Sequence, residues 1–133
     1  MFRRQANIEV VPSSLLVTYV GIEFVRADTE QVWKVAFRDE GKWLFGLYSP
    51  ENTSLEDVDF LEKHDGPELF YLMNGAVTLV VKEKEEIEEI PLQRDTVVIV
   101  DTWHNAYSPK GKRGVCLVIE KDGVSSEIQK IVS

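Results

Sequence analysis

Short apolar runs separated by turn residues dominate the pattern of hydrophobic and polar positions along the chain. Residues 32–37 and 42–48 are two such runs, and Asp39-Glu40-Gly41 between them predicts a hairpin. Residues 67–73 and 76–81 are two more, separated by little more than Asn74-Gly75. Asn-Gly between apolar runs is typical of a type I′ turn, because both residues tolerate positive φ. The pattern therefore predicts a second hairpin there.

Further runs of β-type residues continue this pattern. They cover residues 15–25, 87–92, 96–100 and 114–119. Gly21 interrupts the first of them, which indicates a bulge or bend. Residues 125–132 form either a last strand or a terminal helix. Many short strands at roughly even spacing predict an all-β fold, either a sandwich or a barrel.

Residues 54–64 fit two interpretations. The first is a helix that begins at Ser54 as N-cap and has apolar residues at three-residue spacing. The second is a loop followed by a short strand at residues 60–64. The choice decides where Glu62 and His64 point.

Composition narrows the class of protein. A length of 133 residues suits one domain, residues 1–133. The net charge of −8 repels phosphate backbones and anionic lipid headgroups, so we expect neither nucleic acid nor membrane as a partner. The one cysteine, Cys116, lies in an apolar run and is expected to be an inert buried thiol. Neither a secretory signal nor an apolar run of about 18 residues is found, so the expected location is cytoplasmic.

The candidate chemistry is carried by the two histidines, His64 and His104, which lie at the edges of β-type runs. Imidazole and carboxylate ligands together suit Zn²⁺, Fe²⁺, Mn²⁺ or Ni²⁺. Glu62, His64 and Glu68 are separated by even numbers of residues, so a regular strand would place them on one face. The alternative is structural: His64 caps the turn that follows it, and His104 packs beside Trp103. Glu68 precedes an apolar run, where a carboxylate is costly to bury without a partner.

These residues resemble the motifs of the cupin superfamily. Its first motif reads His-x-His, three or four residues, Glu, six residues, Gly. Here Glu62-Lys63-His64 is followed by three residues, Glu68, six residues and Gly75. Its second motif is similar to residues 94–105, which end in Trp103-His104-Asn105. The resemblance covers about residues 60–120 and implies a double-stranded β-helix, the jelly-roll barrel of cupins.

This sequence also departs from the cupin pattern. Glu62 stands where the first metal histidine is usual, and Asp101-Thr102 replaces a proline-containing turn. The asparagine expected after His104 is missing, because Asn105 comes too early. The resemblance therefore implies the fold more strongly than it implies the metal.

The resemblance implies a divalent transition metal (Fe, Mn, Ni or Zn) held by His64, Glu68 and His104, with Glu62 as a possible fourth ligand. The expected function is a small-molecule enzyme with dioxygenase, isomerase or lyase chemistry. Glu62, where it is not a ligand, would act as a general base. One alternative is a metal-free ligand-binding protein. The other is a sugar-nucleotide isomerase or epimerase in which His64 works with a catalytic tyrosine, Tyr71 or Tyr107.

Cupin domains commonly pair as homodimers, and we expect the same of this chain. Residues 8–11 are the candidate for an edge strand exchanged between the two copies.

Overall fold

Strands make up almost all of the regular structure. The computed structural model describes residues 3–5, 8–10, 22 and 24–131 of the chain. The strands in order are β1 (Arg3–Gln5), β2 (Ile8–Val10), β3 (Trp33–Asp39), β4 (Trp43–Tyr48), β5 (Phe60–His64), β6 (Glu68–Asn74), β7 (Thr78–Glu83), β8 (Glu86–Pro91), β9 (Val97–Val100), β10 (Trp103–Tyr107), β11 (Val115–Lys121) and β12 (Ser126–Lys130). One 3₁₀ turn, η1 (Leu55–Asp57), interrupts them. The all-β prediction is confirmed.

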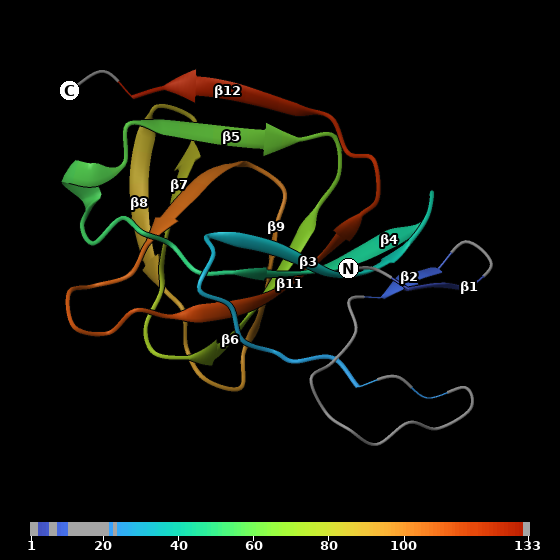
Figure 1. The fold of residues 1–133 in the computed structure, drawn as a ribbon. Helices are drawn as coiled ribbons and strands as arrows, with labels where there is room; N and C mark the ends of the chain where they lie inside the picture. Colours follow the sequence, from blue (N-terminus) through green and yellow to red (C-terminus); the bar gives the residue numbers. More distant parts are fainter. Residues whose placement is uncertain (1–2, 6–7, 11–21, 23, 132–133) are drawn as a thin grey trace.

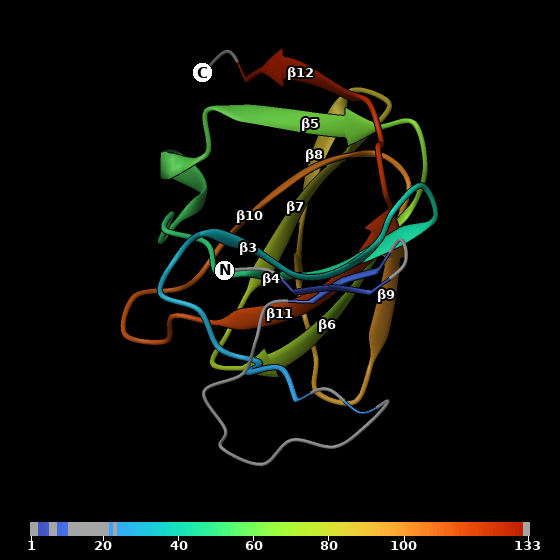
Figure 2. The ribbon, with the colours of Figure 1, turned by 45° about the vertical axis from the view of Figure 1, so that its right-hand side comes forward.

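The strands form two antiparallel sheets that face each other as a jelly roll (Figures 1 and 2). The order in the larger sheet is β1-β2-β3-β4-β11-β6-β9, and in the smaller sheet it is β12-β5-β10-β7-β8. Side chains alternate along each strand, so that every second residue points between the sheets. The site described below therefore has two walls of different origin.

The Asn74-Gly75 turn does not close a hairpin, and that prediction is wrong. β6 belongs to the larger sheet and β7 to the smaller one, so the turn carries the chain from one sheet to the other. Gly75 has a φ of +68°, but Asn74 is not among the residues with positive φ, so a type I′ turn is not formed. A Cβ at Gly75 would lie 2.2 Å from the carbonyl oxygen of Arg113. The glycine is needed for this close approach rather than for a hairpin.

The Asp39-Glu40-Gly41 prediction is confirmed. β3 and β4 pair antiparallel, and Gly41 has a φ of +79°. The amide of Lys42 donates a hydrogen bond to the carbonyl of Asp39 across the turn, at 2.9 Å.

The main core lies between the two sheets. Its buried residues come from both walls: Phe70, Leu72, Val77, Leu79, Val81, Leu92, Val100, Ala106, Cys116 and Val118. Cys116 is fully buried, and burial raises the pKa of its thiol to about 12, as expected for an inert cysteine. A second, smaller cluster of Val58, Leu61 and Val80 covers the outer face of the smaller sheet.

Residues 54–64 adopt the second interpretation, a loop with one 3₁₀ turn followed by β5. Ser54 is extended and makes no side-chain cap, so nothing starts an α-helix there. Leu61 instead packs into the outer cluster as a strand residue. Because Leu61 faces outward, its neighbour Glu62 faces the other way, and His64 lies on the same side as Glu62.

Both ends of the described chain form strands. Residues 126–130 form β12, so the last segment is a strand and not a helix. β2 pairs with β3 of its own chain, while most of the predicted 15–25 run, including Gly21, lies outside the described residues. Among the described residues, no helix has the length and apolar character needed to cross a membrane. The homodimer stays a prediction, which light scattering at micromolar concentration tests.

Candidate metal centre

Both sheets contribute side chains to one buried polar cluster. His64 on β5 and His104 on β10 come from the smaller sheet, and Glu68 at the start of β6 comes from the larger one. The pairing of β10 with β5 sets His104 opposite Glu62, which fixes the height of His104 in the barrel. Glu68 and His104 are each 5% exposed. Residues distant in the sequence thus converge inside the fold.

The two imidazole rings meet at one carboxylate oxygen. Nε2 of His104 lies 2.6 Å from Oε1 of Glu68, and Nε2 of His64 lies 2.8 Å from the same atom. Glu62 is farther out, with its Oε1 at 3.6 Å from Nε2 of His64. The three residues expected as ligands are therefore together, and Glu62 stands beside them.

The second ring nitrogen of each histidine, Nδ1, has a hydrogen-bond partner on the side away from Glu68. Nδ1 of His104 lies 2.9 Å from the carbonyl oxygen of Thr102, and Nδ1 of His64 lies 2.8 Å from Oγ of Ser126. A carbonyl oxygen only accepts, so Nδ1 of His104 carries a hydrogen and donates it. A neutral His104 then has its lone pair on Nε2, directed at Glu68. Such backing of a ring by a carbonyl is usual for metal-bound histidines.

Glu68 supplies a test of whether these residues suit a metal ion. Its Oε1 is buried against two imidazole nitrogens and has a hydrogen-bond partner only where one of these nitrogens carries a proton. An ionised carboxylate and the lone pair of a neutral imidazole repel each other unless a proton or a cation lies between them. Two imidazoles and a carboxylate are ligands that divalent transition metals accept. The residues therefore fit the ion that the cupin resemblance implies.

Protonation of the cluster without an ion follows from its burial and charges. Burial acts to lower the pKa of His104, but the hydrogen bond and charge of Glu68 outweigh it and raise the pKa. Burial likewise acts to raise the pKa of Glu68, and the hydrogen bond and charge of His104 reverse this to a lowered pKa. Without an ion, both directions favour the charged forms of the two side chains, with a proton between them.

Glu120 on β11 is a member of the cluster that the sequence analysis missed. It lies opposite Glu68 in the sheet. Burial and then the charge of Glu68 raise the pKa of Glu120 to about 8. His64, Glu68 and Glu120 offer ligand atoms within 4.8 Å of one another, as do Glu62, His64 and His104. The alternation of Cys116, Val118 and Glu120 along one face of the strand was the signal for this residue.

The two tyrosines suggested for proton transfer lie elsewhere. Tyr71 is three residues after Glu68 on β6, and therefore on the opposite face of that strand. Tyr107 packs against the outer cluster of the smaller sheet, and its hydroxyl donates to Oε1 of Glu89 at 2.8 Å. The structure brings neither of them to His64.

A cavity of about 350 Å³ opens onto the cluster. Glu62, Glu68 and His104 line it, and most of its remaining wall is aromatic or aliphatic. Its residues are Val32, Trp33, Tyr48, Pro50, Glu51, Asn52, Phe60, Glu62, Glu68, Phe70, Leu79, His104 and Asn105. A mostly apolar hollow with a few convergent polar groups is typical of a small-molecule site. Fold and site together define a jelly roll with a ligand cavity beside a His/Glu cluster.

Comparison with known proteins agrees with this description. No family model matches the chain, and no curated protein matches it in sequence. Its solved structural neighbours include a cupin-2 domain protein from Shewanella frigidimarina, with a TM-score of 0.52, 17% identity, and coverage of 71% of this chain and 83% of that one. The polyketide cyclase RemF from Streptomyces resistomycificus gives a TM-score of 0.57 at 10% identity, covering 91% and 87% of the two chains.

A third neighbour is hydroxypropylphosphonic acid epoxidase (HppE) from S. wedmorenis, in complex with fosfomycin. It gives a TM-score of 0.58 at 14% identity, and the match covers 80% of this chain but 59% of the epoxidase. Other structures of this enzyme hold Fe(II) or Co(II). The structural similarity to these three proteins shows that the chain has a cupin-type fold.

Proposed function

We propose that the chain is a metal-dependent enzyme of the cupin type, in which His64, Glu68 and His104 hold one divalent transition metal ion. The observation that carries this proposal is the convergence of two imidazole nitrogens on the buried Oε1 of Glu68. Neighbours of the same fold that hold Fe(II) or Co(II) support it. Three protein ligands leave coordination positions open for water or substrate.

Glu62 is assigned a separate role at the cavity. Its carboxylate lines the hollow, and its side chain is 37% exposed, whereas Glu68 is buried. An ion in the cluster would polarise a substrate oxygen as a Lewis acid. Glu62 then accepts the substrate proton as a general base, and Ser126 and Thr102 keep the two histidines oriented. A base beside a polarised oxygen favours isomerase or lyase chemistry.

Metal analysis tests the proposal directly. Protein purified without chelator is expected to contain close to one equivalent of Fe, Mn, Ni or Zn, or to take it up on addition. We expect H104Q and E68Q to lose this uptake. The matched control is E86Q, which removes an exposed carboxylate on β8 and should keep it. Metal content near zero that none of these four ions changes would overturn the proposal.

The metal-free ligand-binding alternative makes a different prediction. In that case H64A and H104A alter the affinity for a ligand, and neither protein nor variants show turnover with any of the four metals. The sugar-nucleotide alternative required a tyrosine beside His64, and both suggested tyrosines face away from it. We therefore favour the metal-dependent enzyme.

A further inference from the structure

The charged residues that line the cavity indicate which charge of ligand it would accept. Apart from Glu68 and His104, the acidic residues that line it are Glu51 and Glu62, and its described lining includes neither lysine nor arginine. Two basic residues, Lys110 and Arg113, line a second hollow that shares Pro50 and Glu51 with this cavity, and the guanidinium of Arg113 donates to Oγ of Ser49 at 2.9 Å. An anionic ligand would thus meet two carboxylates and no basic side chain.

Aromatic rings form much of the remaining wall. Trp33, Tyr48, Phe60 and Phe70 all line the cavity, and Trp33 and Phe60 are 38% and 36% exposed. Exposed faces of aromatic rings attract organic cations, and desolvation strengthens the attraction. Rings and carboxylates together are the combination that recognises a substituted ammonium group.

The position of Trp33 is built into the sheet. Its ring lies over Gly46 on the neighbouring strand β4, where a Cβ would lie 2.1 Å from a ring carbon. A residue with a side chain at this position would push the ring off the strand. The absence of a side chain at Gly46 therefore allows an indole at the cavity wall.

The amide side chain in the wall is already engaged. Nδ2 of Asn105 donates to the carbonyl of Phe60 at 2.9 Å, and its Oδ1 accepts from the amide of Ala106 at 2.8 Å. Asn105 therefore fixes the wall and adds no charge to it. The charge of the hollow is set by Glu51, Glu62 and the occupant of the cluster.

We propose that this cavity takes a small organic cation, an amine or quaternary ammonium compound with an apolar or aromatic body. The inference deepens the proposed function and rests on it for the reaction, but the preference for a cation comes from the walls alone. Without metal, no cation offsets the carboxylates of Glu51 and Glu62 in the wall. A metal ion bound by His64, Glu68 and His104 would reduce the preference for a cationic ligand, because it adds positive charge beside the cavity.

Three probes of similar size and different charge test this: benzyltrimethylammonium, benzyl alcohol and benzoate. Ligand-observed NMR titrations at pH 8 give each dissociation constant, first with chelator-treated protein and then with the metal-loaded form. In the metal-free protein we expect the cation to bind at least about tenfold more tightly than benzoate, a difference of about 1.4 kcal/mol. Benzoate binding as tightly as the cation, or no binding of any probe, would overturn the inference.

Variants separate charge from shape. In the double variant E51Q/E62Q, we expect the dissociation constant of benzoate to exceed that of benzyltrimethylammonium by less than about threefold, because the charge attraction is lost. E86Q, on the exposed strand β8, is the matched control and should leave the ratio unchanged. G46A should weaken all three probes together, because it displaces Trp33. An unchanged ratio in the double variant would contradict the role of the two acids.

Metal content, measured on the same samples, keeps the two proposals distinct. A cation preference without any metal uptake leaves this inference standing and removes the metal-dependent enzyme. Metal uptake without a cation preference does the reverse.

Discussion

Glu120 gives the metal-free protein a dependence of stability on pH whose sign the structure fixes. Burial and the charge of Glu68 raise its pKa from 4.5 to about 8. The folded protein therefore binds more protons at Glu120 than the unfolded chain does between these two values. Stability falls as pH rises through this window, by at most about 1.4 kcal/mol per pH unit for one proton.

The other two titrating members of the cluster act with defined signs. The raised pKa of His104 gives a contribution that is present at low pH and lost as pH rises through its folded value. The lowered pKa of Glu68 gives a contribution that is lost only as pH falls below its usual range. Because Glu120 contributes to the lowered pKa of Glu68, a comparison of wild type with a variant at position 120 reports Glu120 together with its coupling to Glu68.

E120Q is the appropriate variant, because the amide has nearly the size and shape of the carboxyl but does not titrate. Urea denaturation of chelator-treated protein between pH 5 and pH 8 gives the free energy of unfolding of both proteins. We expect wild type to lose more stability than E120Q as pH rises, with the gap widening steadily toward pH 8. A gap that stays constant, or one that narrows, would refute this assignment of Glu120.

The remaining predictions concern the support of the site and the core. S126A removes the partner of His64 and should weaken metal affinity about tenfold, while the adjacent S125A should not; equal affinities would contradict the role of Ser126. L61A empties a site that is 1% exposed and should lower the free energy of unfolding by about 2–5 kcal/mol in urea; a loss well under 1 kcal/mol would be inconsistent with this packing. G75A forces a Cβ against a carbonyl at positive φ and should cost at least about 1 kcal/mol, whereas unchanged stability would show that the turn adapts.

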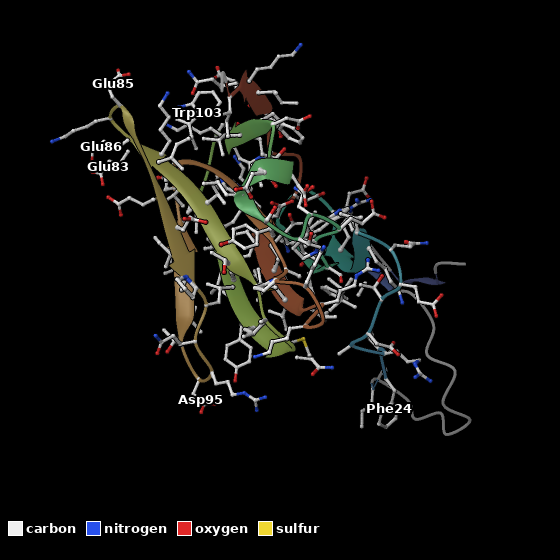
Figure 3. The ribbon with its side chains drawn as sticks, turned by 90° about the vertical axis from the view of Figure 1, so that its left-hand side faces the viewer. Phe24, Glu83, Glu85, Glu86, Asp95 and Trp103 are labelled. Carbon is white, nitrogen blue, oxygen red and sulfur yellow. The ribbon has the colours of Figure 1, made fainter. Side chains whose placement is uncertain are left out.

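Local sequence patterns predicted the strands well, because apolar and polar residues alternate along a strand that buries one of its faces. The acidic end of β7 and β8 is an example: Glu83, Glu85 and Glu86 gather at the tip of this hairpin, away from the core (Figure 3). These acids lie between the apolar runs at residues 76–81 and 87–92 that predicted the two strands. Such a turn depends only on its own residues and on solvent.

The Asn74-Gly75 error has a different physical origin. Turn chemistry reports which φ values a residue tolerates, but it does not report which sheet the next strand joins. That choice depends on the pairing of β6 with β11 and of β7 with β10, strands that come later in the chain. Residues 54–64 show the same limit of local patterns. Their apolar residues are spaced as in a helix, but Val58 and Leu61 pack against the smaller sheet.

The site was predicted in part. His64, Glu68 and His104 were found through motif spacing, and the fold brings them together. Glu120 was missed because an acid that ends an apolar run usually marks where a strand meets solvent. Its partner is Glu68, 52 positions earlier by number, and only the register of β11 against β6 sets them side by side.

The division of the cluster between two sheets links ligand binding to folding. His64 and His104 are fixed to the smaller sheet, whereas Glu68 and Glu120 are fixed to the larger one. An ion held by His64, His104 and Glu68 would connect the two walls. Because the unfolded chain cannot assemble these ligands, binding energy adds to stability, by about 2.7 kcal/mol at a metal concentration one hundred times the dissociation constant. Glu68, through which a metal would stabilise the fold, therefore lies opposite Glu120, the group that makes the metal-free fold sensitive to pH.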